Sequence, residues 1–420
     1  MTAFRTLDDL PEAQRVLCRL DLNSPVEDGE VQDNRRFERH AETVRELSEA
    51  GHRVALLAHQ GRPGRDTFVT LEQHADILAD HAGVDVTYVP DTYGEEALEA
   101  VQSLEAGEVV LLENTRMVDA ELPEEEPATK ADTEFVQTLA PAFDAYVNDA
   151  YSAAHRSHAS LVGFSQVLPA YAGRVMATEY EANTAVAARE FDGKVTMVVG
   201  GTKATDVIDV METLEDTVDT FCLGGIAGQL FLHAAGHSVA DGLGEVDDPA
   251  DAAGLLDEQW AANGETVDEL LTERADDIEL AVDLAYEAEN GERAEVAVAD
   301  LDDVDAEFLD IGSDTVAAYG SEIRDSEAVF VKGALGVFED ERFADGTVGV
   351  LEAIAETDCF SVVGGGDTSR AIEMYGLDEA DFSHVSIAGG AYIRALTGVE
   401  LAAVAELERN AAERTGLDET

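Results

Sequence analysis

Short apolar runs alternate with amphipathic segments along the whole chain. In the first half, strands are predicted at residues 16–22, 54–58, 84–89, 109–112 and 145–148. Helices are predicted between these strands, at residues 38–50, 71–81, 95–104 and 130–139. The first of these helices is followed by Gly51, a residue typical of helix C-caps. The alternation of strand and helix predicts a mainly parallel sheet with helices on both faces.

The same alternation begins again after a long helical segment at residues 171–189. Further strands are predicted at residues 194–200, 217–223, 294–299, 328–331 and 360–363. We therefore expect an α/β protein of two doubly wound, parallel-sheet (Rossmann-like) domains, with a connecting helix at the boundary. Residues 241–277 are acidic and weakly patterned, which predicts a peripheral helical excursion. Residues 401–414 predict an amphipathic helix that could pack on either domain.

Negative charge dominates the composition. The 420 residues include 90 Asp and Glu against 26 Lys and Arg, which gives a formal net charge of −64. The carboxylates are spread along the chain, and a hydrophobic content of 45% argues against a disordered acidic protein. So much negative charge disfavours nucleic acid and anionic membrane surfaces as partners. It predicts a surface adapted to high salt, where the Debye length falls to about 3 Å at 1 M.

Three cysteines, Cys18, Cys222 and Cys359, lie far apart in apolar runs and show no CxxC spacing. This arrangement disfavours zinc sites and disulfides, and it predicts small core residues in a reducing compartment. Residues 1–15 are mixed and charged, and no apolar run reaches about 18 residues, so we expect neither a signal peptide nor a membrane span. A cytoplasmic location is therefore expected.

Arginine and histidine side chains recur in short motifs of the first half, near the apparent ends of strands. These motifs are Asn34-Arg35-Arg36, His59-Gln60-Gly61-Arg62-Pro63, Glu113-Asn114-Thr115-Arg116 and Ala154-His155-Arg156-Ser157-His158. Asp21 and Asn23 follow the first predicted strand. Ligands of open α/β sheets bind beyond the carboxyl ends of the strands, so these side chains can converge at one edge.

Guanidinium groups pair with phosphate oxygens, so this convergence predicts a small polyanionic ligand that carries a phosphate. Each residue considered alone could also have a purely structural role. An arginine could form a surface ion pair with one of the many carboxylates. His59 could be a satisfied buried histidine, and Asp21 and Asn23 could form a turn before Pro25. The loop at residues 122–127 is rich in Pro and Glu, and we assign it no function.

Glycine-rich turns follow strands in the second half. Gly364-Gly365-Gly366-Asp367-Thr368-Ser369 lies between a strand and a helix, where backbone N–H groups and the helix N-terminus favour a phosphate. Asp367 could cap this helix or bind Mg²⁺. Similar segments are Gly200-Gly201-Thr202-Lys203, Gly224-Gly225, Gly389-Gly390 and residues 333–339. Each alone could be a tight connection. Neither GxxxxGK[ST] nor GxGxxG is present, which leaves a nucleotide site built from several loops.

Taken together, these motifs resemble phosphoglycerate kinase. The resemblance extends from Arg19-Leu20-Asp21-Leu22-Asn23-Ser24-Pro25 to Gly389-Gly390, nearly the whole chain. It implies reversible transfer of the acyl phosphate of 1,3-bisphosphoglycerate to Mg-ADP, which gives 3-phosphoglycerate and ATP in glycolysis or gluconeogenesis. It also implies a monomer with a substrate domain at residues 1–170, a connecting helix at 171–190 and a nucleotide domain at 191–395. Residues 396–420 would return to the first domain.

The resemblance also implies roles for individual residues. Those that bind the phosphoglycerate would be Asp21, Leu22, Asn23, Arg36, His59, Gln60, Gly61, Arg62, Arg116 and Arg156. Those that bind the nucleotide would be Gly201, Lys203, Gly225, Leu309, Val337, Glu339, Gly365, Gly366, Asp367 and Thr368, with Asp367 also the magnesium ligand. Arg36 and Lys203 would be catalytic, because they would face the phosphoryl group in transfer. The acceptor is an ionised carboxylate, so no general base is expected.

Three departures from the family pattern leave details open. A second lysine often follows four residues after Lys203, where this chain has Val207. An Asn-Gly-Pro turn is replaced by Lys332-Gly333-Ala334, so Lys332 could supply the missing charge or could be a surface lysine. The turn at residues 387–390 also differs. Two other functions remain possible: a related kinase acting on another acyl phosphate, or an inactive phosphate-binding homologue.

Overall fold

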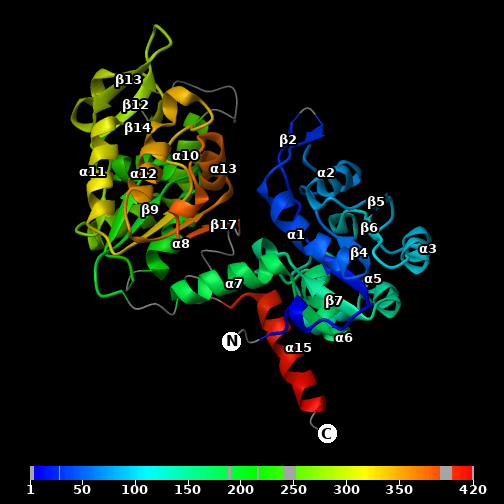
Figure 1. The fold of residues 1–420 in the computed structure, drawn as a ribbon. Coiled ribbons are helices and arrows are strands. Elements are labelled where there is room, and N and C mark those ends of the chain that lie inside the picture. Colours follow the sequence, from blue (N-terminus) through cyan, green and yellow to red (C-terminus); the bar gives the residue numbers. More distant parts are fainter. Residues whose placement is uncertain are drawn as a thin grey trace. The chain divides into compact units, whose positions relative to one another are not determined.

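The computed structural model describes residues 4–27, 29–187, 191–214, 217–239, 252–387 and 400–418. The chain divides into two compact units, the first formed by Met1–Ala187 with Gly390–Thr420 and the second by Ala188–Gly389. The predicted α/β class is confirmed, because each unit contains a six-stranded parallel sheet flanked by helices (Figure 1).

The first unit is built on a sheet with the strand order β5-β6-β4-β1-β7-β8. Its strands are β1 (Arg15–Arg19), β4 (Arg53–Leu57), β5 (Val86–Val89), β6 (Val109–Leu112), β7 (Ala145–Asn148) and β8 (Ala170–Ala172). The helices of this unit are α1 (Arg35–Glu49), α2 (Glu72–Ala82), α3 (Glu95–Ser103), α4 (Pro127–Ala131), α5 (Glu134–Leu139), α6 (Phe164–Val167), α7 (Arg174–Ala187) and α15 (Ala402–Asp418). A short hairpin of β2 (Val26–Glu27) and β3 (Glu30–Val31) precedes α1.

Alternate residues of the central strands form one apolar core with the inner faces of α1 and α2. Val16 and Cys18 of β1 pack in this core with Phe37 and Val44 of α1. Asn34 caps α1, because its side chain accepts a hydrogen bond from the backbone N–H of Arg36 at 2.9 Å. The helix therefore begins at a fixed point directly beside the sheet edge that carries the sequence motifs.

The second unit has a main sheet with the order β11-β10-β9-β15-β16-β17. Its strands are β9 (Val195–Val199), β10 (Thr220–Leu223), β11 (Ile278–Glu279), β15 (Ala328–Lys332), β16 (Phe360–Gly364) and β17 (His384–Ser386). A separate antiparallel sheet contains β12 (Asp283–Glu287), β13 (Arg293–Ala297) and β14 (Phe308–Ile311). The helices are α8 (Ala204–Thr213), α9 (Gly225–Ala234), α10 (Ala252–Glu273), α11 (Ser313–Arg324), α12 (Asp345–Ala355) and α13 (Gly366–Met374).

Three predicted elements are wrong in detail. The helix expected at residues 130–139 is two short helices, because Thr133 leaves the helical conformation and caps α5 through its side chain. The helix expected from residue 171 begins at Arg174, since Tyr171 lies in the edge strand β8. The strand expected at residues 294–299 does form as β13, but it pairs antiparallel with β12 outside the main sheet.

The C-terminal helix α15 packs on the first unit. Asn410 is buried there, and its side chain donates to the carbonyl oxygens of Ser165 at 2.6 Å and Leu168 at 2.9 Å. It also accepts from the backbone N–H of Ala170 at 2.9 Å. The helical excursion predicted after residue 241 contains α10, which packs against α9, while residues 240–251 lie outside the described part. Within the described residues, every helix is too short or too polar to cross a bilayer.

Candidate active site

The carboxyl ends of four neighbouring strands carry the motifs of the first unit. The strands β6, β4, β1 and β7 are adjacent in the sheet, and each is followed by one of the motif loops. Asp21, His59, Asn114 and Arg156 belong to these four loops in the order β1, β4, β6 and β7. The structure therefore brings the predicted residues of the first unit to one sheet edge, as open α/β sheets do at their ligand sites.

Asp21 is a buried anion with several donors around it. Arg36 Nη1 donates to its Oδ2 at 2.8 Å, the backbone N–H of Asn23 donates to its Oδ1 at 3.1 Å, and the Ser152 hydroxyl also donates to Oδ2. Burial raises the pKa of Asp21, but the charge of Arg36, together with the hydrogen bond from Ser152, outweighs burial and holds the pKa far below its usual value. The carboxylate is thus ionised throughout the neutral range, and Arg36 is held at the sheet edge.

His59 is buried beside Arg19, a residue whose role the sequence did not reveal. Arg19 Nη2 lies 2.9 Å from His59 Nδ1, and Arg19 Nε donates to the Ser160 hydroxyl at 2.8 Å. Because arginine can only donate, Nδ1 of His59 must be the acceptor and its proton must lie on Nε2. Burial lowers the pKa of His59 well below its usual value, so the imidazole is neutral. The sequence signal was a charged side chain inside an apolar strand.

Side-chain amides connect the neighbouring loops of this edge. Asn114 accepts from the backbone N–H of Gln60 at 3.2 Å and donates to its carbonyl oxygen at 2.8 Å. Gln60 contacts Ser24 in the same way, since it accepts from the N–H and donates to the carbonyl, both at 2.8 Å. Asn23 Oδ1 accepts from the N–H of Gly61 at 2.8 Å. Leu22, another predicted site residue, is fully buried in the core beneath these loops.

Arg116 and Arg62 both lie at this edge of the sheet. Arg116 donates through Nη1 to the carbonyl oxygen of Gly61, while its buried Nε has no hydrogen-bond partner among the described residues. Burial lowers the pKa of Arg116 to about 10, with a further contribution from the positive charge of Arg19. Arg62 is exposed on the turn that follows β4. An N–H group that has lost its water without gaining a partner is suited to an anionic acceptor.

Arg156 differs from these arginines, because a carboxylate of the protein already contacts it. Its Nη1 lies 3.3 Å from Oε1 of Glu124, which belongs to the acidic loop at residues 122–127. Oε2 of the same carboxylate accepts from the backbone N–H of Ser157 at 2.7 Å. His158 lies nearby and is neutral, since burial lowers its pKa to about 4.

The second unit brings its glycine turns together behind the carboxyl ends of β9, β10 and β15. Gly201 N donates to the carbonyl oxygen of Ala334 at 2.7 Å, and Gly225 N donates to that of Leu335 at 2.9 Å. A side chain on Gly225 would lie 2.8 Å from the backbone nitrogen of Gly201, and Gly225 has a φ of +61°. Only glycine fits where these loops touch.

The loop after β16 leads into α13. Gly365 is the N-cap of α13 with a φ of +112°, Gly366 and Asp367 are exposed, and Thr368 is buried against the carbonyl oxygen of Gly364. The pKa of Asp367 is raised, first by loss of solvent and then by the nearby Glu339 carboxylate. Lys203 is exposed at the N-cap of α8. The predicted residues in the loops after β9, β10, β15 and β16 thus follow neighbouring strands of the main sheet.

Val337 and Glu339 belong to the loop after β15, whereas Leu309 lies within β14 of the separate antiparallel sheet. The N–H of Val337 donates to the carbonyl oxygen of Leu309 at 2.8 Å, and Val337 is exposed. Glu339 forms an exposed ion pair with Arg370 at 3.4 Å. Val207 is 0% exposed on the inner face of α8, so its side chain belongs to the core. The turn at Gly389-Gly390 lies outside the described residues.

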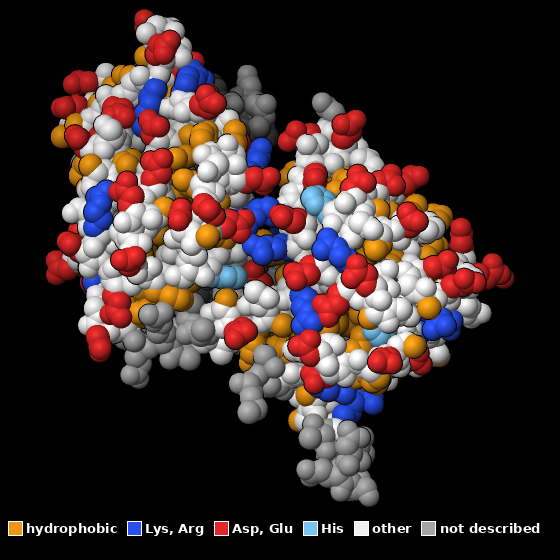
Figure 2. All heavy atoms as spheres, in the orientation of Figure 1, with side chains coloured by type: hydrophobic (Ala, Val, Ile, Leu, Met, Phe, Trp, Pro, Cys, Tyr) orange, Lys and Arg blue, Asp and Glu red, His pale blue; other side chains and the backbone are white. Residues whose placement is uncertain are grey.

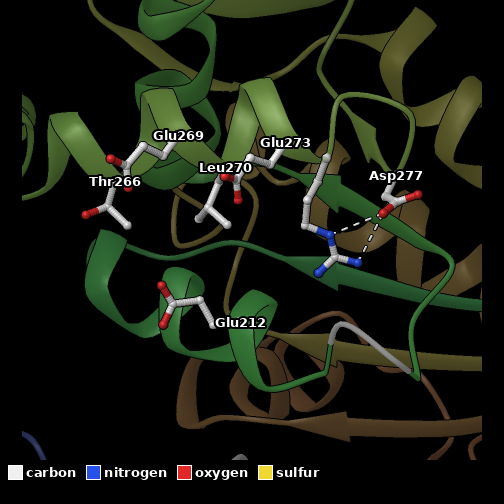
Figure 3. Close-up of a pocket in the computed structure, with 7 residues that line it drawn as sticks. Glu212, Thr266, Glu269, Leu270, Glu273 and Asp277 are labelled. Atoms are coloured by element: carbon white, nitrogen blue, oxygen red, sulfur yellow. Dashed lines mark hydrogen bonds and ion pairs between the residues drawn. The ribbon is translucent and has the colours of Figure 1, made fainter.

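A cavity of about 390 Å³ in the second unit does not suit an anion. It is lined by Glu212, Thr266, Glu269, Leu270, Glu273, Arg274 and Asp277 (Figure 3). Its one arginine is already paired with Asp277 at 3.1 Å. Four carboxylates around a neutralised cation repel phosphate, so the candidate site remains at the two sheet edges.

Comparisons with known proteins agree on one family. The family model described as "Phosphoglycerate kinase" matches residues 7–399. A phosphoglycerate kinase of Halorubrum lacusprofundi is 72% identical over 408 residues, which covers 97% of this chain and 98% of that protein. One of Haloarcula marismortui is 67% identical over 406 residues, with 97% and 100% covered. The crystal structure of phosphoglycerate kinase from Pyrococcus horikoshii OT3 has a TM-score of 0.89 and 31% identity, and the match covers 98% of this chain and 100% of that chain. The chain therefore belongs to the phosphoglycerate kinase family and is a kinase that transfers phosphate between ADP or ATP and 3-phosphoglycerate.

Proposed function

We propose that the edge of the first unit binds 3-phosphoglycerate and 1,3-bisphosphoglycerate. His59, Arg62, Arg116 and Arg156 hold the phosphate that does not react. The observation that supports this most is the buried Nε–H of Arg116, which has no partner among the described residues. A phosphate oxygen would satisfy this donor, whose desolvation otherwise costs about 1–3 kcal/mol. His59 adds a neutral Nε2–H donor whose tautomer is set by Arg19.

Asp21, Asn23 and Arg36 act at the other end of the same ligand in this proposal. Asn23 uses its amide oxygen on Gly61, so its amide NH₂ is the group that can donate to the glycerate. Asp21 is ionised and can accept from the glycerate hydroxyl. Arg36 lies beside it and faces the phosphoryl group in transfer, where its charge offsets the charge on the transferring oxygens.

The loops of the second unit bind the nucleotide. Gly365, Gly366 and Thr368 take its phosphates at the N-terminus of α13, and Lys203 binds the transferring group. Glu339 binds the ribose, and the adenine base lies in a slot lined by Gly201, Gly225, Leu309 and Val337. Asp367 is the magnesium ligand. This fits the residues present, because Asp367 has an exposed position in the first turn of α13, beside the proposed phosphate site, and Mg²⁺ is commonly held by one or two carboxylates plus substrate phosphates. Bound there, the ion neutralises phosphate charge.

The acceptor in the ATP-consuming direction is the ionised carboxylate of 3-phosphoglycerate. It attacks the terminal phosphorus, the bond from that phosphorus to the ADP oxygen breaks, and no proton has to be removed. The protein therefore contributes positioning and charge neutralisation. The two ligands bind to different units, so the units must bring them together and exclude water during transfer. We further propose that the enzyme works as a cytoplasmic monomer in concentrated salt, which its acidity supports.

A coupled assay in strong KCl tests these roles. ATP-dependent conversion of 3-phosphoglycerate is measured for the wild type, Lys203→Ala and Arg36→Ala, with Arg39→Ala, an exposed arginine on the same helix as Arg36, as the control. Lys203→Ala and Arg36→Ala should each lose activity by about a hundredfold or more, because each removes a positive charge that faces the transferring phosphoryl group. Inactive wild type would overturn the proposed reaction. Full activity of Arg36→Ala would overturn the role of that residue.

A further inference from the structure

The acidic loop at residues 122–127 lies beside the anion site of the first unit. It follows the short helix that carries Arg116 and precedes α4. On its other side it contacts residues 156–158, the segment that contains Arg156. No role for this loop follows from the sequence alone, and yet it touches the neighbourhood of two of the three arginines proposed to hold the phosphate.

The loop is anchored on both sides of Glu124. Before it, the buried carboxylate of Glu121 accepts from the backbone N–H and the hydroxyl of Ser160 at 2.7 and 2.6 Å. After it, Glu125 forms an ion pair at 3.2 Å with Lys130, whose side chain is 0% exposed and donates to the carbonyl oxygen of Ala120 at 2.8 Å. The position of Glu124 is therefore set by its neighbours.

Glu124 itself makes the contacts that a phosphate would make. One of its oxygens accepts from the backbone N–H of Ser157 at 2.7 Å, and the other lies 3.3 Å from Nη1 of Arg156. His158 Nε2 is 3.6 Å from that second oxygen. A carboxylate held by a guanidinium and a backbone N–H occupies the same donors that bind phosphate oxygens in proteins. These donors lower the pKa of Glu124 despite its partial burial.

We propose that Glu124 competes with the substrate phosphate for Arg156. The carboxylate holds the guanidinium while the site is empty, and the non-reacting phosphate of 3-phosphoglycerate displaces it on binding. Glu124 would thus set the affinity of the enzyme for the phosphorylated acid. This inference rests on the proposed role of Arg156 in binding that phosphate.

The exchange is physically easy. The side chains of Arg156 and Glu124 are 43% and 47% exposed, and exposed ion pairs are weak. A phosphate monoester carries a charge of about −2 and three acceptor oxygens, so it outcompetes one carboxylate. Arg116 needs no such exchange, since it donates to a backbone carbonyl and keeps a buried Nε without a partner among the described residues.

The test compares Glu124→Gln with Glu126→Gln. Both variants remove one negative charge from the same loop, so long-range electrostatic effects are matched, but Glu126 is exposed and only the first variant alters the contact with Arg156. Glutamine also keeps an oxygen that can accept from Ser157. Binding of 3-phosphoglycerate is measured by calorimetry in strong KCl, and the KM of each substrate and the melting temperature are measured in the same buffer.

We expect Glu124→Gln to bind 3-phosphoglycerate about two- to fivefold more tightly than Glu126→Gln, with the KM of ATP unchanged. The gain should disappear in an Arg156→Ala background. Equal affinities in the two variants, or weaker binding by a folded Glu124→Gln, would overturn the competition. If Arg156→Ala alone leaves the affinity unchanged, the proposed role of Arg156 fails instead, so the two failures are distinguishable.

Discussion

Gln60 shows at the residue scale how one motif side chain can connect several loops of a site. Its amide oxygen accepts from Ser24 and lies 3.1 Å from His74 Nε2, while its NH₂ donates to Ser24 and to the carbonyl oxygen of Thr67. The side chain is 0% exposed, so these four contacts use its hydrogen-bonding capacity. We therefore expect Gln60 to position the loops that carry Asn23 and Arg62.

Gln60→Glu tests this positioning. A carboxylate lacks the donors for Ser24 and Thr67, so the loops should shift and the KM of the phosphoglycerate substrate should rise about tenfold or more, with the KM of ATP unchanged. Gln102→Glu makes the same chemical change on the exposed face of α3 and serves as the control. Steady-state kinetics measures both variants, and equal KM values would contradict the positioning role.

Lys332 is a second residue whose role, supplying positive charge to the nucleotide site, can be tested by substitution. It ends β15 directly before the Gly333 turn, whereas Val207 is buried and so cannot present charge to a ligand. We predict that Lys332→Asn raises the KM of the nucleotide about fivefold and spares the phosphoglycerate substrate, because a cation is lost beside the nucleotide phosphates. Lys194→Asn removes the same charge before the amino end of β9 and should leave the KM of the nucleotide unchanged. Unchanged nucleotide affinity in Lys332→Asn would refute the compensation for Val207.

Asp310 makes stability depend on pH. Its carboxylate lies between Gly336 and Gly346, accepts from Arg293 at 3.0 Å, and keeps one buried oxygen without a partner among the described residues. Burial raises its pKa from 3.8 to about 6. Between these values the folded state keeps a proton that the unfolded chain would lose, so stability falls as the pH rises through this window, by up to about 3 kcal/mol.

Asp310→Asn cannot titrate and should lack this contribution. Unfolding of the wild type and the variant is measured in the same KCl at about pH 4 and about pH 7. The stability of the wild type relative to the variant should decrease toward the higher pH. A difference that does not change with pH would contradict the raised pKa.

At the scale of elements, the start of α1 connects helix stability to the position of Arg36. Asn34 accepts from the N–H of Arg36 and donates to the Ser24 hydroxyl at 2.6 Å. Asn34→Ala should lower the free energy of unfolding by about 1 kcal/mol. Asn34→Asp keeps the capping oxygen and should retain most of the stability. Urea unfolding in KCl distinguishes the two variants, and equal stability of Asn34→Ala and the wild type would argue against the cap.

Elements were predictable from the sequence where local pattern and burial agree. The strands at residues 109–112 and 145–148 were predicted to the residue, because each is a short, fully buried apolar run. The break at Thr133 was missed although its cap is local, because the side chain accepts from the N–H of Val136 three residues later. The strand at Tyr171 was missed because an edge pairing depends on tertiary contacts. The antiparallel pairing of β13 was missed for the same reason, because a strand's pattern does not name its partner.

The candidate site, too, was predicted from the sequence in part. Motif spacing predicted which loops would share a sheet edge, because strand order in an α/β sheet follows from few topological choices. It did not predict that the Gln60 side chain contacts Ser24 or that Glu124 contacts Arg156, since both contacts depend on loops that are distant in sequence. Arg19 was missed although an arginine in an apolar strand is unusual, because its partners His59 and Ser160 lie on segments distant in sequence.

At the scale of the whole molecule, carboxylates are spread over the visible surface of both units, with few cations between them (Figure 2). A net charge of −64 makes the folded state repel itself at low ionic strength. Dissolved salt screens this repulsion, and it equally screens the attraction between the arginines of the first unit and a phosphate. Salt should therefore stabilise the fold and weaken substrate binding at the same time.

We predict that the melting temperature falls as KCl is lowered from about 2 M to about 0.1 M, where the Debye length reaches about 10 Å. Over the range in which the enzyme stays folded, the KM of the phosphoglycerate substrate should also fall as the KCl concentration is lowered. Calorimetric melting and steady-state kinetics at each KCl concentration measure the two trends, with sucrose at matched osmolality as a control that does not screen charge. An unchanged melting temperature would mean that repulsion among the carboxylates does not limit stability. The salt adaptation would then have to come from interactions other than screening.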